Sequence, residues 1–136
     1  LHHLFPTDST ANSRRGNLPF GEVKTVTWTA PNLDGGDGSR LGTDAAGRTT
    51  FEPQSRVKGD IARALLYFYT RYAGAPPSKF STTNFTVEQA TLLRWHQQDP
   101  PDAAERLHND AVYGVQRNRN PYIDHHEYVN AIGTFK

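Results

Sequence analysis

Apolar residues at helical spacing predict a first long helix from about Ser55 to Tyr72. The stripe comprises Ile61, Leu65, Phe68, Tyr69 and Tyr72. The segment Ala73 to Pro77 contains glycine and two prolines and is expected to end this helix.

Two further helices follow in the second half of the chain. One is expected to begin at Thr86, where Thr86 and Gln89 fit a capping box ahead of an apolar stretch that includes Leu92, Leu93 and Trp95. The next is expected to have Asp99 as its N-cap and Pro100 at its first position, and to run to about Val115. Its apolar stripe would be Leu107, Ala111 and Val115.

The first half of the chain indicates short strands. The segment 23–28 is rich in β-branched residues and predicts a strand, and 49–52 is a candidate partner that Pro53 would end. A glycine-rich polar loop from Pro31 to Arg48 would connect them in a short β-hairpin. A short helix from Ser9 or Thr10 would carry Asn12 in its first turn. The pattern predicts one mostly helical α+β domain over residues 1–136.

Composition fits a small core with a polar surface. Hydrophobic residues make up 35% of the 136 residues, while seven Phe, six Tyr and two Trp supply large apolar areas. No apolar run reaches the roughly 18 residues that a membrane span needs. The absence of Cys excludes disulfides, thiolate zinc sites and a thiol nucleophile.

Charge alone does not indicate nucleic-acid binding, because the net charge is only +1. Most of the basic residues are nevertheless Arg, whose planar fork suits phosphate better than the point charge of Lys. Genomic base composition is an alternative reason for the abundance of Arg.

The N-terminal region gathers residue types that phosphodiester hydrolysis needs. His2 and His3 could supply a base or a ligand, and the amide oxygen of Asn12 suits a hard divalent cation. Arg14 and Arg15 could hold the phosphate. The structural alternative is a capped loop with His2 packed beneath it and both arginines solvated.

A second polar cluster comprises Arg117, Asn118, Arg119 and Asn120. In an extended stretch Arg117 and Arg119 would share a face and could flank a run of phosphates. The alternative is a polar connector whose Asn side chains satisfy turn backbone.

Other metal-site candidates are weaker. The segment 34–38 lacks the ligand spacing and the twelfth-position Glu of a calcium loop, which favours a flexible connector. The cluster 124–127 is a ligand candidate, whereas His96 and His108 are expected on the surface or packed between helices.

Several motifs, in order along nearly the whole chain, resemble the bacterial endonuclease I family of secreted and periplasmic nucleases. They are Leu-His-His-Leu-Phe-Pro-Thr-Asp at 1–8, Asn-Ser-Arg-Arg-Gly-Asn at 12–17, Pro-Phe-Gly-Glu-Val at 19–23, Lys-Gly-Asp-Ile-Ala-Arg-Ala at 58–64, Leu-Arg-Trp-His at 93–96 and Gln-Arg-Asn-Arg-Asn-Pro-Tyr-Ile-Asp-His at 116–125.

The resemblance implies a ββα-metal, or His-Me finger, site that cleaves DNA, and often RNA, with little sequence preference. Asn12 would help to hold a divalent cation, with Mg²⁺ expected and Ca²⁺ or Mn²⁺ as alternatives. Arg15 and Asn17 would lie near the phosphate or support the site. Contacts to the phosphate backbone from Arg14 and from residues 117–120 fit this behaviour.

One family feature is missing from this sequence. The general-base His lies in a segment resembling Arg-Glu-His-x-x-Pro, ahead of the Leu-His motif, and this chain has no such segment. His2 and His3 are the candidate substitutes, although few residues separate them from Asn12.

The chain starts with Leu and contains no Met, so we expect the larger, C-terminal portion of such a nuclease. An N-terminal fragment or another protein chain would then cover the exposed edge. The alternative function is an inactive nuclease-fold module with a structural or self-assembly role.

Overall fold

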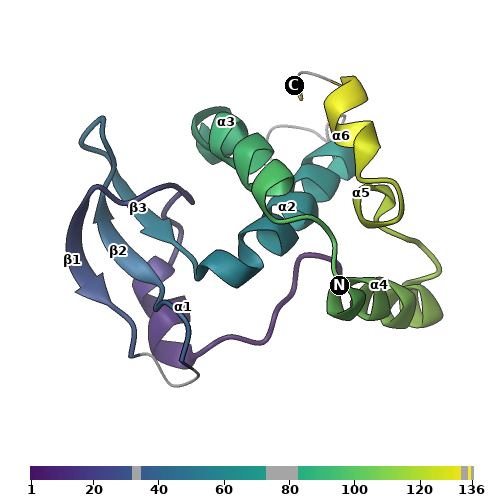
Figure 1. The fold of residues 1–136 in the computed structure, drawn as a ribbon, viewed down its shortest axis with the longest axis horizontal. Coiled ribbons are helices and arrows are strands. Elements are labelled where there is room, and N and C mark those ends of the chain that lie inside the picture. Colours follow the sequence, from purple (N-terminus) through teal and green to yellow (C-terminus); the bar gives the residue numbers. More distant parts are fainter. Residues whose placement is uncertain (32–34, 73–82, 133–134, 136) are drawn as a thin grey trace. The chain divides into compact units, whose positions relative to one another are not determined.

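The computed structural model describes residues 1–31, 35–72, 83–132 and 135, and these form two compact units. Among the described residues, the first unit comprises 1–4, 58–72, 92–132 and 135, and the second comprises 5–31, 35–57 and 83–91. Helices and an antiparallel sheet are both present, so the predicted α+β class is confirmed (Figure 1). The prediction of one domain over residues 1–136 stays a prediction.

The second unit contains a three-stranded antiparallel sheet in the order β1 (Thr25–Thr29), β2 (Arg40–Thr43) and β3 (Thr49–Glu52) (Figure 1). The two predicted strands exist, but their predicted pairing is wrong because β2 lies between them. Because β2 contains Gly42 and lies in a glycine-rich segment, the sequence predicts a loop there. A Cβ at this position would lie 2.0 Å from the backbone oxygen of Thr25, so the close approach of β1 requires glycine.

Strand β1 lies at one edge of the sheet and contains a β-bulge. Val26 pairs with Gly42 and Trp28 with Leu41, so Thr27 is an additional residue on β1. Four of its five residues are exposed, and Trp28 alone in this strand is half-buried. A bulge changes the direction of the neighbouring side chains, and it therefore interrupts the alternation expected of a regular strand.

Helix α1 (Ser9–Arg15) begins at Asp8, whose Oδ1 accepts a hydrogen bond from the backbone N of Ala11 at 2.9 Å. The predicted helix is confirmed, with Asp8 as its cap in place of Ser9 or Thr10. The helix ends at Gly16, which has a φ of +51° and donates its N–H to the backbone oxygen of Asn12 at 3.0 Å.

Helix α2 (Lys58–Tyr72) follows a 3₁₀ turn at Ser55–Val57. Its fully buried side is formed by Gly59, Ala62, Arg63, Ala64 and Leu66. The predicted apolar stripe is only half-buried, and Tyr72 is exposed. The predicted end of this helix at 73–77 lies outside the described residues.

Helix α3 (Thr83–Gln98) begins three residues before the predicted cap, so the predicted capping box at Thr86 is wrong. Its residues Leu92 and Trp95 are fully buried in the first unit, as expected for core positions. Lys58 places its ammonium group 5.3 Å from the centre of the Trp95 ring.

Helix α4 (Ala103–Gln116) is capped by Asp102, whose Oδ1 accepts from the backbone N of Glu105 at 2.8 Å. The prediction of Asp99 as the cap is wrong, because its carboxylate accepts from the backbone N of Gly59 at 2.8 Å.

The predicted apolar stripe of α4 lies on the solvent side. Leu107 and Val115 are 68% and 74% exposed, and Ala111 is exposed as well. The buried residues are Glu105, Asn109 and Val112. The prediction of a buried stripe is therefore wrong, because the inner face of this helix holds Glu105, the ion-pair partner of Arg63, and Asn109, which bonds to Asn120.

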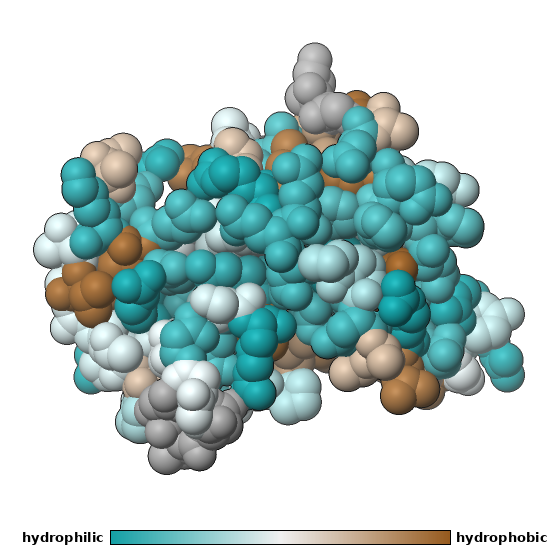
Figure 2. All heavy atoms as spheres, in the orientation of Figure 1, coloured by the Kyte–Doolittle hydropathy of each residue, from teal (hydrophilic) through white to brown (hydrophobic). Residues whose placement is uncertain are grey.

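Two short helices complete the first unit, α5 (Pro121–Asp124) and α6 (Glu127–Ile132). Helix α5 contacts α2, α4 and α6, and Tyr122, Ile123 and Val129 enter the core. Figure 2 shows hydrophilic side chains over most of the visible face, as the low hydrophobic share predicts. No helix in the described ranges has the length and apolar character of a membrane span.

Candidate functional site

Helix α1 presents Asn12 with two arginines that each lie over an aromatic ring. The Arg14 guanidinium lies 5.5 Å from the centre of the Trp28 ring, and that of Arg15 lies 4.1 Å from the centre of the Phe20 ring. Successive helical residues point about 100° apart, so the two side chains reach different rings. The Asn12 side chain is exposed, and its amide oxygen fits one ligand position of a hard cation.

Glu88 is a buried carboxylate next to this group and was not predicted. Its Oε1 accepts from the backbone N of Phe20 at 2.5 Å. Burial raises the pKa of Glu88, against the effects of the Phe20 hydrogen bond and the nearby charge of Arg15. The sequence does hold a signal, because Glu88 lies at helical spacing from the buried Phe85 and Leu92.

The loop after α1 is held by backbone contacts to β3. Phe51 donates its N–H to the backbone oxygen of Pro19 at 3.0 Å, and Gly21 donates to the backbone oxygen of Phe51 at 3.1 Å. Asn17 is exposed, and its backbone oxygen accepts from Asn84 Nδ2 at 2.9 Å. The predicted phosphate role of Asn17 stays a prediction.

His2 is a packed residue of the first unit, with 4% of its surface exposed. Its Nε2 donates toward the backbone oxygen and Oδ1 of Asn118, both at 3.1 Å, and its ring meets Tyr67 edge-on. Burial is the main cause that lowers the pKa of His2. Its Nδ1 is also buried, which fits the packed alternative, and the catalytic role of His2 stays a prediction.

His3 differs from its neighbour because its ring is exposed. It lies tilted against Phe68, with 5.2 Å between ring centres. Partial burial, followed by the positive charges of the N-terminus and His2, lowers the pKa of His3. A neutral, exposed imidazole can accept a proton, so a catalytic role for His3 stays a prediction. Both histidines belong to the first unit, whereas Asn12 and its arginines belong to the second.

The segment 117–120 does not form the predicted extended stretch. Arg117 has a φ of +60° and ends α4 in the left-handed conformation. Asn120 is fully buried and caps α5, where its Oδ1 accepts from the backbone N of Tyr122 at 3.0 Å. This burial fits the alternative in which the Asn120 side chain satisfies turn backbone, and its role in nucleic-acid binding stays a prediction.

The remaining two polar residues of this segment have partners within the first unit. Arg119 pairs with Asp124 and Asp110, each at 2.7 Å, and these carboxylates raise the pKa of Arg119. Asn118 accepts from His2. The roles of Arg117, Asn118 and Arg119 in binding phosphate stay predictions, and Arg117 is the most exposed of the three.

The other metal candidates do not form a ligand set. Across the described ranges, no three His, Asp or Glu side chains are placed to hold a metal ion, and the weaker ligand candidate at 124–127 stays a prediction. There His125 stacks on Tyr128, with 4.8 Å between ring centres. Part of the 34–38 segment lies outside the described residues.

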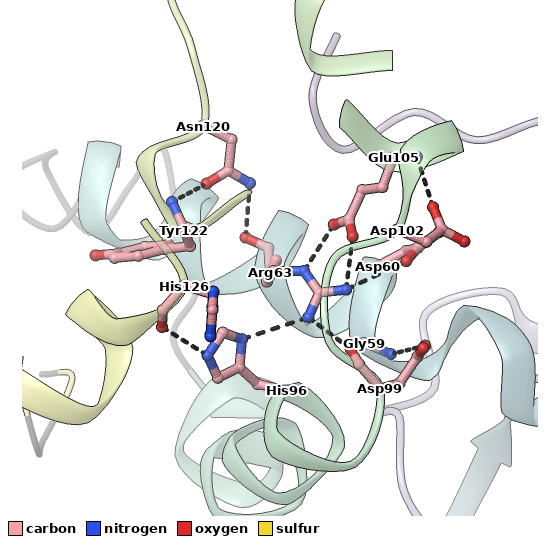
Figure 3. A network of polar contacts seen from close by, with 10 residues as sticks. All are labelled: Gly59, Asp60, Arg63, His96, Asp99, Asp102, Glu105, Asn120, Tyr122 and His126. Carbon is pink, nitrogen blue, oxygen red and sulfur yellow. Dashed lines mark hydrogen bonds and ion pairs between the residues drawn. The ribbon is translucent and has the colours of Figure 1, made fainter. Parts of the chain in front are cut away.

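Arg63 is the centre of a buried polar network in the first unit that was not predicted (Figure 3). It forms a two-point ion pair with Glu105, at 2.7 and 2.6 Å, and its Nη1 donates to the backbone oxygen of Asp99 at 2.7 Å. Its Nη2 lies 3.3 Å from Asp60. Burial and the negative charge of Glu105 raise the pKa of Asp60 to about 7.

The same network fixes His96, whose Nε2 donates to the backbone oxygen of His126 at 2.9 Å. His96 is buried between helices, which confirms its predicted packing role. A Cβ at position 59 would lie 1.9 Å from the backbone oxygen of Asp99, so Gly59 is required for this close packing. The centre of the network, at Arg63, His96 and Glu105, is buried.

Curated relatives are secreted nucleases. An extracellular ribonuclease of Bacillus subtilis (strain 168) is 37% identical over 97% of this chain and 46% of the relative. An extracellular ribonuclease of Bacillus amyloliquefaciens is 35% identical over 97% of this chain and 45% of the relative. An extracellular deoxyribonuclease of Aeromonas hydrophila is 29% identical over 91% of this chain and 48% of the relative.

The chain spans about half the length of these relatives. No solved structure gives a significant match. The family model described as Endonuclease I matches residues 1–127, which include α1 with Asn12, the Arg63 network and the segment 117–120. With nearly all of its length matched in this way, the chain belongs to the endonuclease I family.

Proposed function

We propose that this chain is part of a secreted or periplasmic, metal-dependent nuclease that hydrolyses phosphodiesters with little sequence preference. The observation that carries the proposal is the arrangement on α1, where an exposed Asn12 accompanies two arginines held over aromatic rings, in a chain of the endonuclease I family. The names of the extracellular relatives support the location.

Each residue of this group has a distinct proposed task. The amide oxygen of Asn12 is one ligand for Mg²⁺, which binds few protein ligands and keeps several waters. When bound, the cation would neutralise negative charge on the departing oxygen. Arg15, packed on Phe20, holds the scissile phosphate, and Arg14 holds a neighbouring one.

Both DNA and RNA are proposed substrates. The relatives include ribonucleases and a deoxyribonuclease. Guanidinium contacts to phosphate carry affinity without reading bases, and they are compatible with either sugar.

The base is proposed to come from another segment, as the family resemblance implies. Within this chain His3 is the alternative, because its ring is exposed while that of His2 is buried. Replacement of His3 by Ala distinguishes them: loss of cleavage supports His3, and retained cleavage assigns the base elsewhere.

The proposal is tested by plasmid nicking and RNA cleavage with Mg²⁺, Mn²⁺ or Ca²⁺, with and without EDTA, using the intact protein. We expect EDTA to abolish cleavage, and Asn12→Ala and Arg15→Ala to reduce it on the order of 10²-fold. Asn130→Ala, at an exposed position of α6, is the matched control and should leave cleavage unchanged. Cleavage that survives both EDTA and Asn12→Ala contradicts the proposal. Absence of cleavage by the intact protein would favour the structural or self-assembly role.

A further inference from the structure

Trp28 has no evident role in the core of the second unit. It lies on the edge strand β1, whose other four residues are exposed, and it is itself only half-buried. A large indole ring on an exposed edge strand is costly unless it contacts something specific. The contact that the structure shows on its ring face is the guanidinium of Arg14, 5.5 Å from the ring centre.

The bulge in β1 places Trp28 out of the regular alternation. The register advances by two residues on β1 between Val26 and Trp28 and by one residue on β2. Bulges redirect side chains and recur beside functional sites. Here the irregularity accompanies the contact between the strand and α1, the helix that carries Asn12.

We propose that Trp28 is a positioning residue for nucleic-acid binding, which holds the Arg14 guanidinium ready to contact a backbone phosphate. This inference rests on the proposed function. It adds a role for a residue of β1 that makes no phosphate contact of its own.

The physical reason lies in the geometry of the guanidinium group. The cation–π contact engages the face of the Trp28 ring, whereas phosphate is bound through the N–H donors of the guanidinium, so both contacts can exist together. A free Arg side chain loses rotamer freedom when it binds phosphate. If Trp28 already restricts Arg14 in the unbound protein, less freedom is lost on binding, and affinity rises.

The test is a double-mutant cycle on binding, with the metal removed by EDTA so that the probe stays intact. The probe is a fluorescein-labelled single-stranded oligothymidylate of about a dozen nucleotides, followed by anisotropy with the intact protein. We expect Arg14→Ala to weaken binding about tenfold. Trp28→Leu should weaken it several-fold, Trp28→Phe should restore part of the loss, and the double variant should bind like Arg14→Ala alone.

Arg71→Ala is the matched control, because the Arg71 guanidinium also lies over an exposed ring, that of Tyr72, at 5.7 Å from the ring centre. It should leave binding unchanged. A second measurement uses the unbound protein: Arg14→Ala should increase acrylamide quenching of Trp28, while Trp95 is fully buried and contributes little.

Additive effects of the two substitutions would overturn the inference, because Trp28 would then act independently of Arg14. Unchanged binding in Arg14→Ala, or unchanged quenching, would overturn it as well. These results leave the proposed function standing if the unmodified protein binds and cleaves. If the unmodified protein neither binds the probe nor cleaves, the proposed function fails and the inference fails with it.

Discussion

Arg63 is a fully buried cation whose charge is shared between the carboxylates of Glu105 and Asp60. Removing one partner of such a pair leaves an uncompensated buried charge. We expect Arg63→Met to lower the free energy of unfolding by about 3–5 kcal/mol, measured by urea denaturation. Arg71→Met, at an exposed position of the same helix, should change it by less than about 0.5 kcal/mol.

The double variant Arg63→Met with Glu105→Leu removes both charges and should recover part of the lost stability. A double variant that is less stable than Arg63→Met alone would contradict this explanation. The loss of stability in Arg63→Met would then not come from the unpaired charge of Glu105.

Asp60 makes stability depend on pH. Its pKa is raised from 3.8 to about 7, so the folded protein binds this proton more tightly than the unfolded chain does. The resulting stabilisation is present below about pH 4 and is lost as pH rises through about 7. Glu105 and Asp99 disfavour the charged form of Asp60, and Arg63 favours it.

We therefore expect the difference in unfolding free energy between Asp60→Asn and the unmodified protein to shift in favour of Asp60→Asn from pH 4 to pH 7. Urea unfolding at several pH values measures it, and the comparison cancels the titration of other groups such as His96. A difference that does not vary with pH would contradict the raised pKa.

At the scale of single residues, the sequence predicts the positions of some side chains but not the burial of others. The placement of Asn12, Arg14 and Arg15 together on one short helix is predicted, because local sequence suffices for it. The burial of Arg63, Glu88 and Asn120 is not, because each depends on partners distant in sequence, such as Asn109, 11 positions from Asn120, and Phe20, 68 positions from Glu88.

Helix α1 depends on its cap, because seven residues are too few for a helix to be stable alone. Asp8→Ala removes the acceptor for the N–H of Ala11 and should cost about 1 kcal/mol. Since α1 carries Asn12 and Arg15, nuclease activity should fall as well. Asp8→Asn keeps a hydrogen-bond acceptor and should retain most nuclease activity. Plasmid nicking measures the activity of both variants. Equal losses of activity in Asp8→Ala and Asp8→Asn would show that the cap is not the cause.

Helix α4 should tolerate substitutions on its apolar face, which the sequence predicts to be buried but which is exposed in the structure. Leu107→Gln and Val115→Gln are expected to change unfolding free energy by less than about 0.5 kcal/mol, because both side chains are largely exposed. Val112→Ala, on the buried side, should cost more than about 1 kcal/mol. Urea denaturation of the three variants measures this, and the opposite order would mean that the helix is rotated.

Helices and strands are predicted correctly where a local sequence pattern is sufficient. They are predicted wrongly where contacts with distant residues determine the structure. Periodicity located α2, α3 and α4, and β-branched residues located β1. Strand β2 was concealed because Gly42, a residue typical of loops, is required by the close approach of Thr25. The start of α4 was misplaced because Asp99 bonds to Gly59 and leaves the cap to Asp102.

The whole chain has a net charge of only +1, so long-range attraction of nucleic acid should be weak and local contacts should dominate. If Arg14, Arg15 and Arg117 each contact one phosphate, the slope of log affinity against log salt should be about −2 for a single-stranded probe. Titration at several salt concentrations measures the slope. A slope steeper than about −5 would require many more contacts than these.

The outward side of α4 also has a practical consequence. Because the sequence contains no cysteine, Val115→Cys would introduce a unique thiol at a position that is 74% exposed. The inner side of the helix, with Glu105 on Arg63, would remain untouched. A dye, spin label or solid support could thus be attached at one defined point, with every molecule held in the same orientation.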